Sequence, residues 1–171
     1  EQGALRLQHV LDQERKVWKE TYLGQTASLD YHPMKIILTS STPFKHNMPF
    51  MFDFPIEIEG KGKVCILYDD EDPTIFIASY NVRIRNMTIR HRDFSDVNAV
   101  YIKRGSAHFE KCTIASDGHC LHVAPRAECY IGDSIIHNGQ SGIRVARRAH
   151  VTCENSLICK NADSGIIVES E

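Results

Sequence analysis

The fold is decided by an eight-residue pattern that occurs four times from residue 82 onward. Its copies read Val82-Arg-Ile-Arg-Asn-Met-Thr-Ile89, Ala107-His-Phe-Glu-Lys-Cys-Thr-Ile114, Cys129-Tyr-Ile-Gly-Asp-Ser-Ile-Ile136 and Val151-Thr-Cys-Glu-Asn-Ser-Leu-Ile158. Each copy alternates apolar and polar residues, which is typical of a strand with one face in a core. The copies follow one another at about 21 to 25 residues, a spacing typical of stacked solenoid repeats.

Each unit also contains a second short apolar alternation after a polar turn. Its apolar pairs are Val100 and Ile102, Leu121 and Val123, Ile143 and Val145, and Ile166 and Val168. The polar breaks are too short for a crossover helix, and strands with the same apolar register in every unit share one core when the units stack in parallel. The sequence therefore predicts an all-β right-handed parallel β-helix, a solenoid like that of pectate lyases.

The residues before the repeats are predicted to extend this architecture. Residues 55–62 form an alternating strand that ends in a glycine turn, and residues 65–67 and 75–77 continue a less regular coil. Residues 33–38 are a further strand candidate. Residues 42–50 read as an irregular hydrophobic loop.

Apolar residues at helical spacing lie near the start of the chain. They are Leu7, Val10, Leu11, Val17 and Trp18. They predict an amphipathic helix over residues 3–20 that caps the open end of the coil, with a partner-binding helix as the alternative. We divide the chain into a capping helix and linker at residues 1–30 and a β-helix at residues 31–171, and we expect a longer parent protein because the chain stops inside a strand pattern.

The composition limits the class of protein. A chain of 171 residues with 42% hydrophobic and 25% charged residues is typical of one globular domain, and no stretch is apolar enough to cross a membrane. The net charge of −2 disfavours a general nucleic-acid binder. No signal or transit peptide is readable at the start.

The six cysteines are interpreted as free thiols rather than as a disulfide framework. The repeat alignment places Cys112, Cys129 and Cys153 at inward positions that do not face one another, which favours small buried side chains and a reducing compartment. A zinc site would use His119, Cys120 and His122, but the chain has no CxxC pair. We therefore predict no metal and no cofactor.

Catalytic residues are not indicated by the pattern. His91 and His137 are expected to face solvent in turns. Carbohydrate-cleaving β-helices need clustered acids in one groove, whereas the acids here lie at turns or in different registers, at Asp93, Asp117, Asp133 and Asp163. We therefore expect no enzyme, with a polysaccharide lyase or hydrolase and a glycan-binding module as the alternatives.

A row of arginines is the outward feature that repeats. Arg104, Arg126 and Arg148 are 22 residues apart, so we expect them to stack at about 4.8 Å, the spacing of neighbouring strands. Such a row suits a partner with carboxylates or phosphates, although Glu128, Glu154 and Glu169 would also balance it. The predicted partner-binding residues are Arg104, Arg126, Arg148, Arg144, His122 and Lys103.

The chain resembles a known family in several of these segments. Residues 55–62, 81–89, 109–114 and 141–145 are similar to the parallel β-helix of the Shc-binding protein and nessun dorma family, and more loosely to the β-helix of F-box substrate receptors of ubiquitin ligases. The first resemblance implies a cytoplasmic adaptor that binds the centralspindlin complex in cytokinesis at the spindle midzone or midbody, with affinity for carbohydrate. The second implies recognition of a protein substrate for ubiquitination. Neither family supplies a binding motif that transfers residue by residue.

Overall fold

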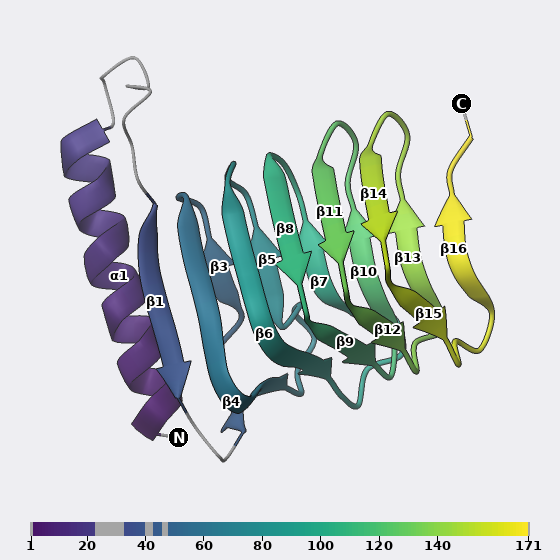
Figure 1. Ribbon diagram of the computed structural model, residues 1–171, viewed down its shortest axis with the longest axis horizontal. Coiled ribbons are helices and arrows are strands. Elements are labelled where there is room, and N and C mark those ends of the chain that lie inside the picture. The colour runs from purple at the N-terminus through teal and green to yellow at the C-terminus, as the bar shows by residue number, and fades with distance from the viewer. Residues whose placement is uncertain (1, 23–32, 40–42, 46–47, 171) are drawn as a thin grey trace.

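Short strands in this protein stack in parallel along one axis and form two sheets (Figure 1). The computed structural model describes residues 2–22, 33–39, 43–45 and 48–170. Within these described residues, sheet A has ten strands and sheet B has six, and both are built from parallel pairs. From β2 onward the chain alternates between one strand or a bent pair of strands in sheet A and one strand in sheet B, so each circuit adds one turn to a solenoid.

The strands of the two sheets have the following bounds. Sheet A contains β1 (Met34–Thr39), β2 (Phe44–Lys45), β4 (Ile56–Tyr68), β6 (Val82–His91), β8 (Ser106–Glu110), β9 (Thr113–Ser116), β11 (Glu128–Gly132), β12 (Ile135–His137), β14 (His150–Glu154) and β15 (Leu157–Cys159). Sheet B contains β3 (Phe50–Phe52), β5 (Ile75–Ile77), β7 (Asn98–Ile102), β10 (His119–Val123), β13 (Ser141–Val145) and β16 (Ser164–Val168).

The register of the strands confirms the repeat alignment. In sheet A, Ile84 pairs with Phe109, Phe109 with Ile131 and Ile131 with Cys153. In sheet B the second alternation pairs in the same way, for example Leu121 with Ile143. The inward members of these rows form one hydrophobic core along the solenoid. The predicted parallel β-helix is therefore confirmed.

A left-handed residue bends the chain within each unit of sheet A. The residues at this bend are Asn86, Lys111, Asp133 and Asn155, with φ of 54°, 53°, 48° and 49°. A single residue with positive φ turns an extended chain sharply, which allows β8 and β9 to lie at an angle with no loop between them. Two hydroxyls then link neighbouring bends, because the backbone N–H of Cys112 donates to Ser134 Oγ and that of Ser134 donates to Ser156 Oγ.

The upstream part is more regular than the sequence indicated. The strand expected at residues 33–38 is β1. The prediction of an irregular loop over residues 42–50 is wrong where the structure describes it, because β2 lies there and β3 begins at Phe50. Phe50 and Phe52 pair with Ile75 and Ile77 and continue the inward row of sheet B, although Pro49 hides this alternation.

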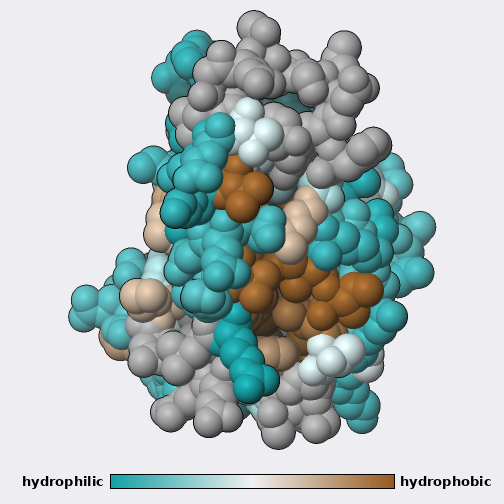
Figure 2. Space-filling view, turned by 90° about the vertical axis from the view of Figure 1, so that its left-hand side faces the viewer, coloured by the Kyte–Doolittle hydropathy of each residue, from teal (hydrophilic) through white to brown (hydrophobic). Residues whose placement is uncertain are grey.

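The helix α1 (Gln2–Tyr22) covers the first end of the solenoid beside β1 (Figure 1). Leu7 and Leu11 are buried in the core, and Arg15 Nε donates to Asp53 Oδ1 at 2.6 Å, which ties α1 to the chain between the two sheets. Figure 2 shows a hydrophilic outer face on this end, with apolar residues beside it. Val17 is 53% exposed, so the apolar face by which α1 packs on the solenoid is narrower than the sequence spacing predicted. The domain boundary expected at residue 30 lies outside the described residues.

Two side chains differ from their predicted environment. His91 was expected in solvent but is fully buried, because it ends β6 on the inward face beside Tyr68 and Thr74. Cys153 was expected in the core but is exposed. It lies in β14, which is the outermost strand of its row in sheet A, so no further strand covers it.

Candidate binding face on sheet B

One outward row crosses every strand of sheet B. The residues of this row, which we name the outer row, pair in register from β3 to β16 and are Met51, Phe76, Tyr101, His122, Arg144 and Ile167. Strand alternation directs these side chains away from the core, since the residues on either side of each one are inward. Stacking therefore places aromatic, imidazole and guanidinium groups side by side on one surface.

Ring contacts hold the middle of the outer row together. The Phe76 and Tyr101 rings lie 5.6 Å apart in an edge arrangement, and the Tyr101 and His122 rings lie 5.1 Å apart. The Lys103 ammonium lies 5.8 Å from the centroid of the Phe76 ring. Aromatic pairs at these separations and cations over rings attract one another, so this surface is ordered before any partner arrives.

Two histidines of β10 lie near Arg144, and their surroundings favour the neutral form of both. Partial burial is the main cause that lowers the pKa of His122 and of His119, and the positive charge of Arg144 lowers both further. Glu169 lies 3.6 Å from the Arg144 Nη2 and raises the pKa of His122 in part. The positive charge in this part of the outer row therefore resides on Arg144 near neutral pH.

Arginines line the turns that leave sheet B. Pro125, Arg126, Arg147 and Arg148 line an open pocket of about 460 Å³, which we name the arginine pocket. The turn with Arg126 follows β10, and the turn with Arg148 follows β13. Because β10 and β13 are neighbours, these two turns stack directly.

Arg104 does not share this geometry. The turn with Arg104 is one residue shorter than the turn with Arg126. The two turns begin at the equivalent residues Lys103 and Ala124 and end before the paired residues Ser106 and Glu128. The residue with positive φ is Gly105 there, and Arg104 Nε donates to the Ala78 carbonyl at 3.1 Å. The expected three-membered stack is therefore a pair, Arg126 and Arg148, with Arg104 beside it in a different conformation.

The structure thus places all six predicted binding residues in sheet B or in the turns that leave it. His122 and Arg144 lie in the outer row, Lys103 and Arg104 follow β7, and Arg126 and Arg148 lie in the next two turns. Phe76 and Pro125 were missed. Aligning Ile75 and Ile77 with Val100 and Ile102 would have identified Phe76 as outward, because the two pairs are in register.

The zinc alternative does not match the geometry. Cys120 is buried, and its thiol lies 3.3 Å from the His137 carbonyl, whereas His119 Nδ1 lies 2.8 Å from Ser141 Oγ. Burial raises the pKa of Cys120 to about 12, and a metal needs the thiolate. Among the residues that the structure describes, no group of three or more His, Cys, Asp or Glu side chains is placed to hold a metal ion.

All six cysteines lie in the described part of the chain, and none forms a disulfide there. Cys112, Cys120 and Cys129 are buried. Burial raises the pKa of Cys112 to about 11 and also raises that of Cys129. These three thiols are therefore protonated and unreactive near neutral pH.

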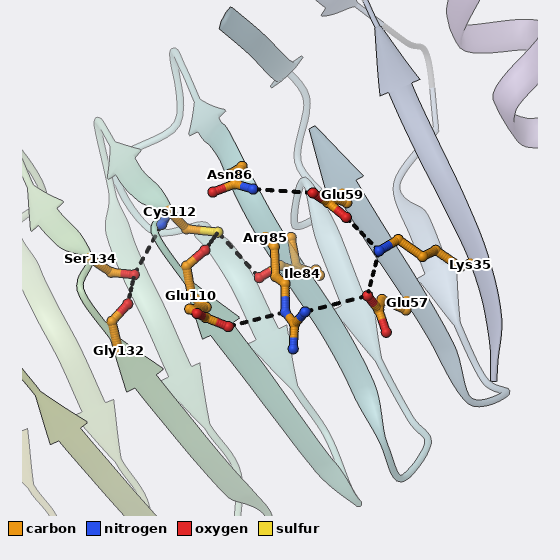
Figure 3. Close-up of polar contacts among 10 residues, drawn as sticks. All are labelled: Lys35, Glu57, Glu59, Ile84, Arg85, Asn86, Glu110, Cys112, Gly132 and Ser134. Carbon is orange, nitrogen blue, oxygen red and sulfur yellow. Dashed lines mark hydrogen bonds and ion pairs between the residues drawn. The ribbon is translucent and has the colours of Figure 1, made fainter. Parts of the chain in front are cut away.

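The outer face of sheet A has a different character. Figure 3 shows a chain of ion pairs that crosses this face from β1 to β8. Lys35 Nζ lies 3.2 Å from Glu57 and 2.5 Å from Glu59, and Arg85 links Glu57 at 3.5 Å to Glu110 at 3.1 Å. Because these cations and carboxylates neutralise one another, sheet A offers a weaker attraction for a charged partner than the basic and aromatic side of sheet B.

Comparison with known proteins agrees with this architecture. Residues 98–171 match the family of right-handed β-helix regions, and this segment begins at β7 and contains most of the outer row and the whole arginine pocket. The parallel solenoid and this match together define a right-handed parallel β-helix. The search of the curated proteins found no match, and the search of the solved structures found none either. In the described part of the chain, no helix is both long and apolar enough to span a bilayer.

Proposed function

We propose that this chain is a non-enzymatic adaptor whose β-helix binds a protein partner through the outer side of sheet B. The observation that carries the proposal is the continuous row from Phe76 to Arg144 with Lys103 and the arginine pocket beside it. Aromatic residues and arginine are enriched at the centres of protein interfaces, where they supply large contact area and directional hydrogen bonds. A β-helix supports such a surface well, because stacked strands hold the side chains in fixed positions.

The cellular setting that we propose follows from the resemblance to the Shc-binding protein and nessun dorma family. In this proposal the partner belongs to a centralspindlin-type complex, and the protein acts in the cytoplasm at the spindle midzone or midbody during cytokinesis. The second setting follows from the looser resemblance to F-box proteins. In that setting the chain is the substrate-recognition domain of a ubiquitin ligase, and its partner is the protein to be ubiquitinated.

The proposal is tested by affinity capture from extracts of dividing cells. The bait is the chain with Arg104, Arg126 and Arg148 all changed to Glu, compared with the wild type. A matched control changes Lys61, Lys63 and Lys111 to Glu in the same way. These residues are exposed cations on the side of sheet A. We expect the first triple variant to lose a discrete complex that wild type and control both retain. Equal capture by all three, with a folded circular dichroism spectrum, would contradict the proposed face.

Carbohydrate binding is a second candidate, favoured by the ring row of Phe76, Tyr101 and His122. Aromatic faces pack against sugar rings, and the nearby Arg144 and Lys103 suit acidic glycans. Calorimetry with polygalacturonate oligomers tests this reading. Saturable binding that is lost in Tyr101→Ala, without new chain ends, would favour a glycan module. New reducing ends or unsaturated products would favour the polysaccharide lyase or hydrolase alternative instead.

A further inference from the structure

The arginine pocket has a backbone that is unusual for its residues. The Ala127 N–H donates to the Ala124 carbonyl at 3.0 Å, and the Ala149 N–H donates to the Ala146 carbonyl at 2.9 Å. With Pro125 at the second position and Arg126 at φ 66°, the first turn is a type II β-turn. Arg148 has φ 60° at the corresponding position of the second turn. Glycine or asparagine is the usual residue at this position of a type II turn.

Arginine is therefore not placed there by backbone preference. Of the ten non-glycine residues with positive φ in the described chain, six are Asn or Asp, which tolerate this conformation best. The equivalent turn after β7 uses Gly105 at φ 86°. Two successive turns thus keep a long cationic side chain where a small residue is easier to accommodate, and strain of this kind is concentrated at functional sites.

The pocket also brings several positive charges together. Equivalent residues of stacked turns lie about 4.8 Å apart, so Arg126 lies next to Arg148 and Pro125 lies next to Arg147. The side chains of three arginines therefore line one open pocket. A doubly charged anion in the pocket is attracted by all three of these side chains.

We propose that the arginine pocket binds the phosphate group of a phosphorylated serine or threonine on the protein partner. This inference rests on the proposed function, since it names the chemistry that the partner presents to this edge. A phosphate monoester carries nearly two negative charges and three acceptor oxygens, and clusters of arginine recognise it through charge-assisted and bidentate hydrogen bonds. A single carboxylate has too few oxygens to engage three guanidinium groups.

A phosphorylated side chain fits the surroundings better than an anionic membrane does. Glu128 follows the first turn closely and is exposed, and Glu169 lies beside Arg144. These carboxylates repel a continuous anionic surface but leave room for one phosphate.

The inference is tested by nuclear magnetic resonance of the arginine Nε–Hε groups in the full chain. The probe is N-acetyl-O-phosphoserine N-methylamide, with its unphosphorylated form, inorganic phosphate, and phosphatidylcholine vesicles that contain phosphatidylserine as comparisons. We expect the phosphoserine probe to shift the signals of Arg126, Arg147 and Arg148 saturably. The unphosphorylated form should shift none of them.

Variants distinguish binding in the arginine pocket from non-specific attraction to basic residues. The variants Arg126→Asn and Arg148→Asn place a residue that tolerates positive φ at these positions, so the chain should stay folded. Each should lower the affinity for the phosphoserine probe at least tenfold. Arg83→Ala is the matched control, because Arg83 is an exposed arginine of β6 in sheet A that does not line the pocket, and it should leave the affinity unchanged. Equal loss in all three variants, or no saturable shift, would overturn the inference.

The remaining outcomes also decide between sources of phosphate. Inorganic phosphate that binds as tightly as the phosphoserine probe, or vesicle binding without probe binding, would overturn the inference in favour of a free anion or a membrane. Capture that depends on the arginines but survives phosphatase treatment of the extract would refute the phosphate and leave the adaptor intact. Probe binding by a chain that captures no complex would support the pocket and refute the adaptor.

Discussion

Single residues with positive φ decide where each turn of this solenoid bends. Asn86, Lys111, Asp133 and Asn155 repeat this conformation in four successive units, and the strands on either side depend on it. Side chains with a branched β-carbon fit this region poorly, whereas Asn fits it well. The chemistry of one side chain is therefore coupled to the direction of a whole strand.

Asp133 provides a test of this coupling. Because its φ is 48°, we expect Asp133→Val to lower the free energy of unfolding by about 1–3 kcal/mol, the cost of a strained backbone conformation. Asp133→Asn is the matched control and should leave stability within about 0.5 kcal/mol of the wild type. Urea unfolding followed by far-ultraviolet circular dichroism measures both. Equal stability of the Val and Asn variants would show that this bend is not strained.

His91 makes stability depend on pH. It is fully buried, and burial lowers its pKa, although the charges of Asp117, Asp69, Asp93 and Asp70 oppose this effect. The unfolded chain binds a proton near the ordinary pKa of about 6.5 while the folded chain does not. Stability is therefore complete above this pH and falls as the pH is lowered toward the folded pKa.

The variant His91→Gln isolates this effect. We expect it to be less stable at pH 7.5, since the contact of Thr74 Oγ1 with His91 Nδ1 at 3.2 Å is lost, but to lose less stability than the wild type between pH 7 and pH 5. His108, His119 and His122 also have lowered pKa values and leave a residual slope in both proteins. Denaturant titrations at several pH values give the two slopes. Identical slopes would mean that the pKa of His91 is the same in the folded and the unfolded chain.

At the scale of elements, α1 protects the first end of the core. Leu11 is fully buried against the solenoid, whereas Val17 is 53% exposed on the same helix. We expect Leu11→Ala to cost about 2–5 kcal/mol, as large-to-small changes in a core do. Val17→Ala should change stability by about 0.5 kcal/mol or less. Thermal and urea unfolding of both variants would show whether α1 is a cap or an independent helix, since equal small effects would contradict the cap.

Whether an element could be predicted depends on how clearly its sequence shows the apolar periodicity. The strands from β6 onward could be predicted because their inward apolar residues recur at the same positions in every unit. The strand β3 could not, because Pro49 and the apolar outward residue Met51 hide the alternation of Phe50 and Phe52. His91 was misplaced because its inward side is set by contacts with Tyr68 and Thr74, which lie 23 and 17 positions earlier in the chain.

The candidate site was predictable where it depends on alternation. Tyr101, His122 and Arg144 face outward because their neighbours in the sequence are apolar and inward. The place of Arg104 depends instead on the length of one turn, and the sequence spacing of 22 residues does not reveal that this turn differs. The pocket itself requires the stacking of two turns, which only the three-dimensional arrangement shows.

At the scale of the whole molecule, the two sheets give the solenoid two different sides. Sheet A carries a network of carboxylates and cations that pair with one another, and sheet B carries the outer row with the arginine pocket at its edge. Because the turns contact only their neighbours, each surface extends along the axis as the units repeat. A partner that binds along sheet B therefore contacts several units at once, and its affinity is distributed over the outer row.

Site-specific photocrosslinking in dividing cells tests this account most directly. A benzoylphenylalanine replaces Lys103 beside the outer row in one protein and His108 on the outer face of sheet A in another, both being exposed positions only five residues apart. The account predicts a discrete crosslinked partner from position 103 and none from position 108. A partner crosslinked from position 108 alone would contradict the claim that sheet B is the binding side of this β-helix.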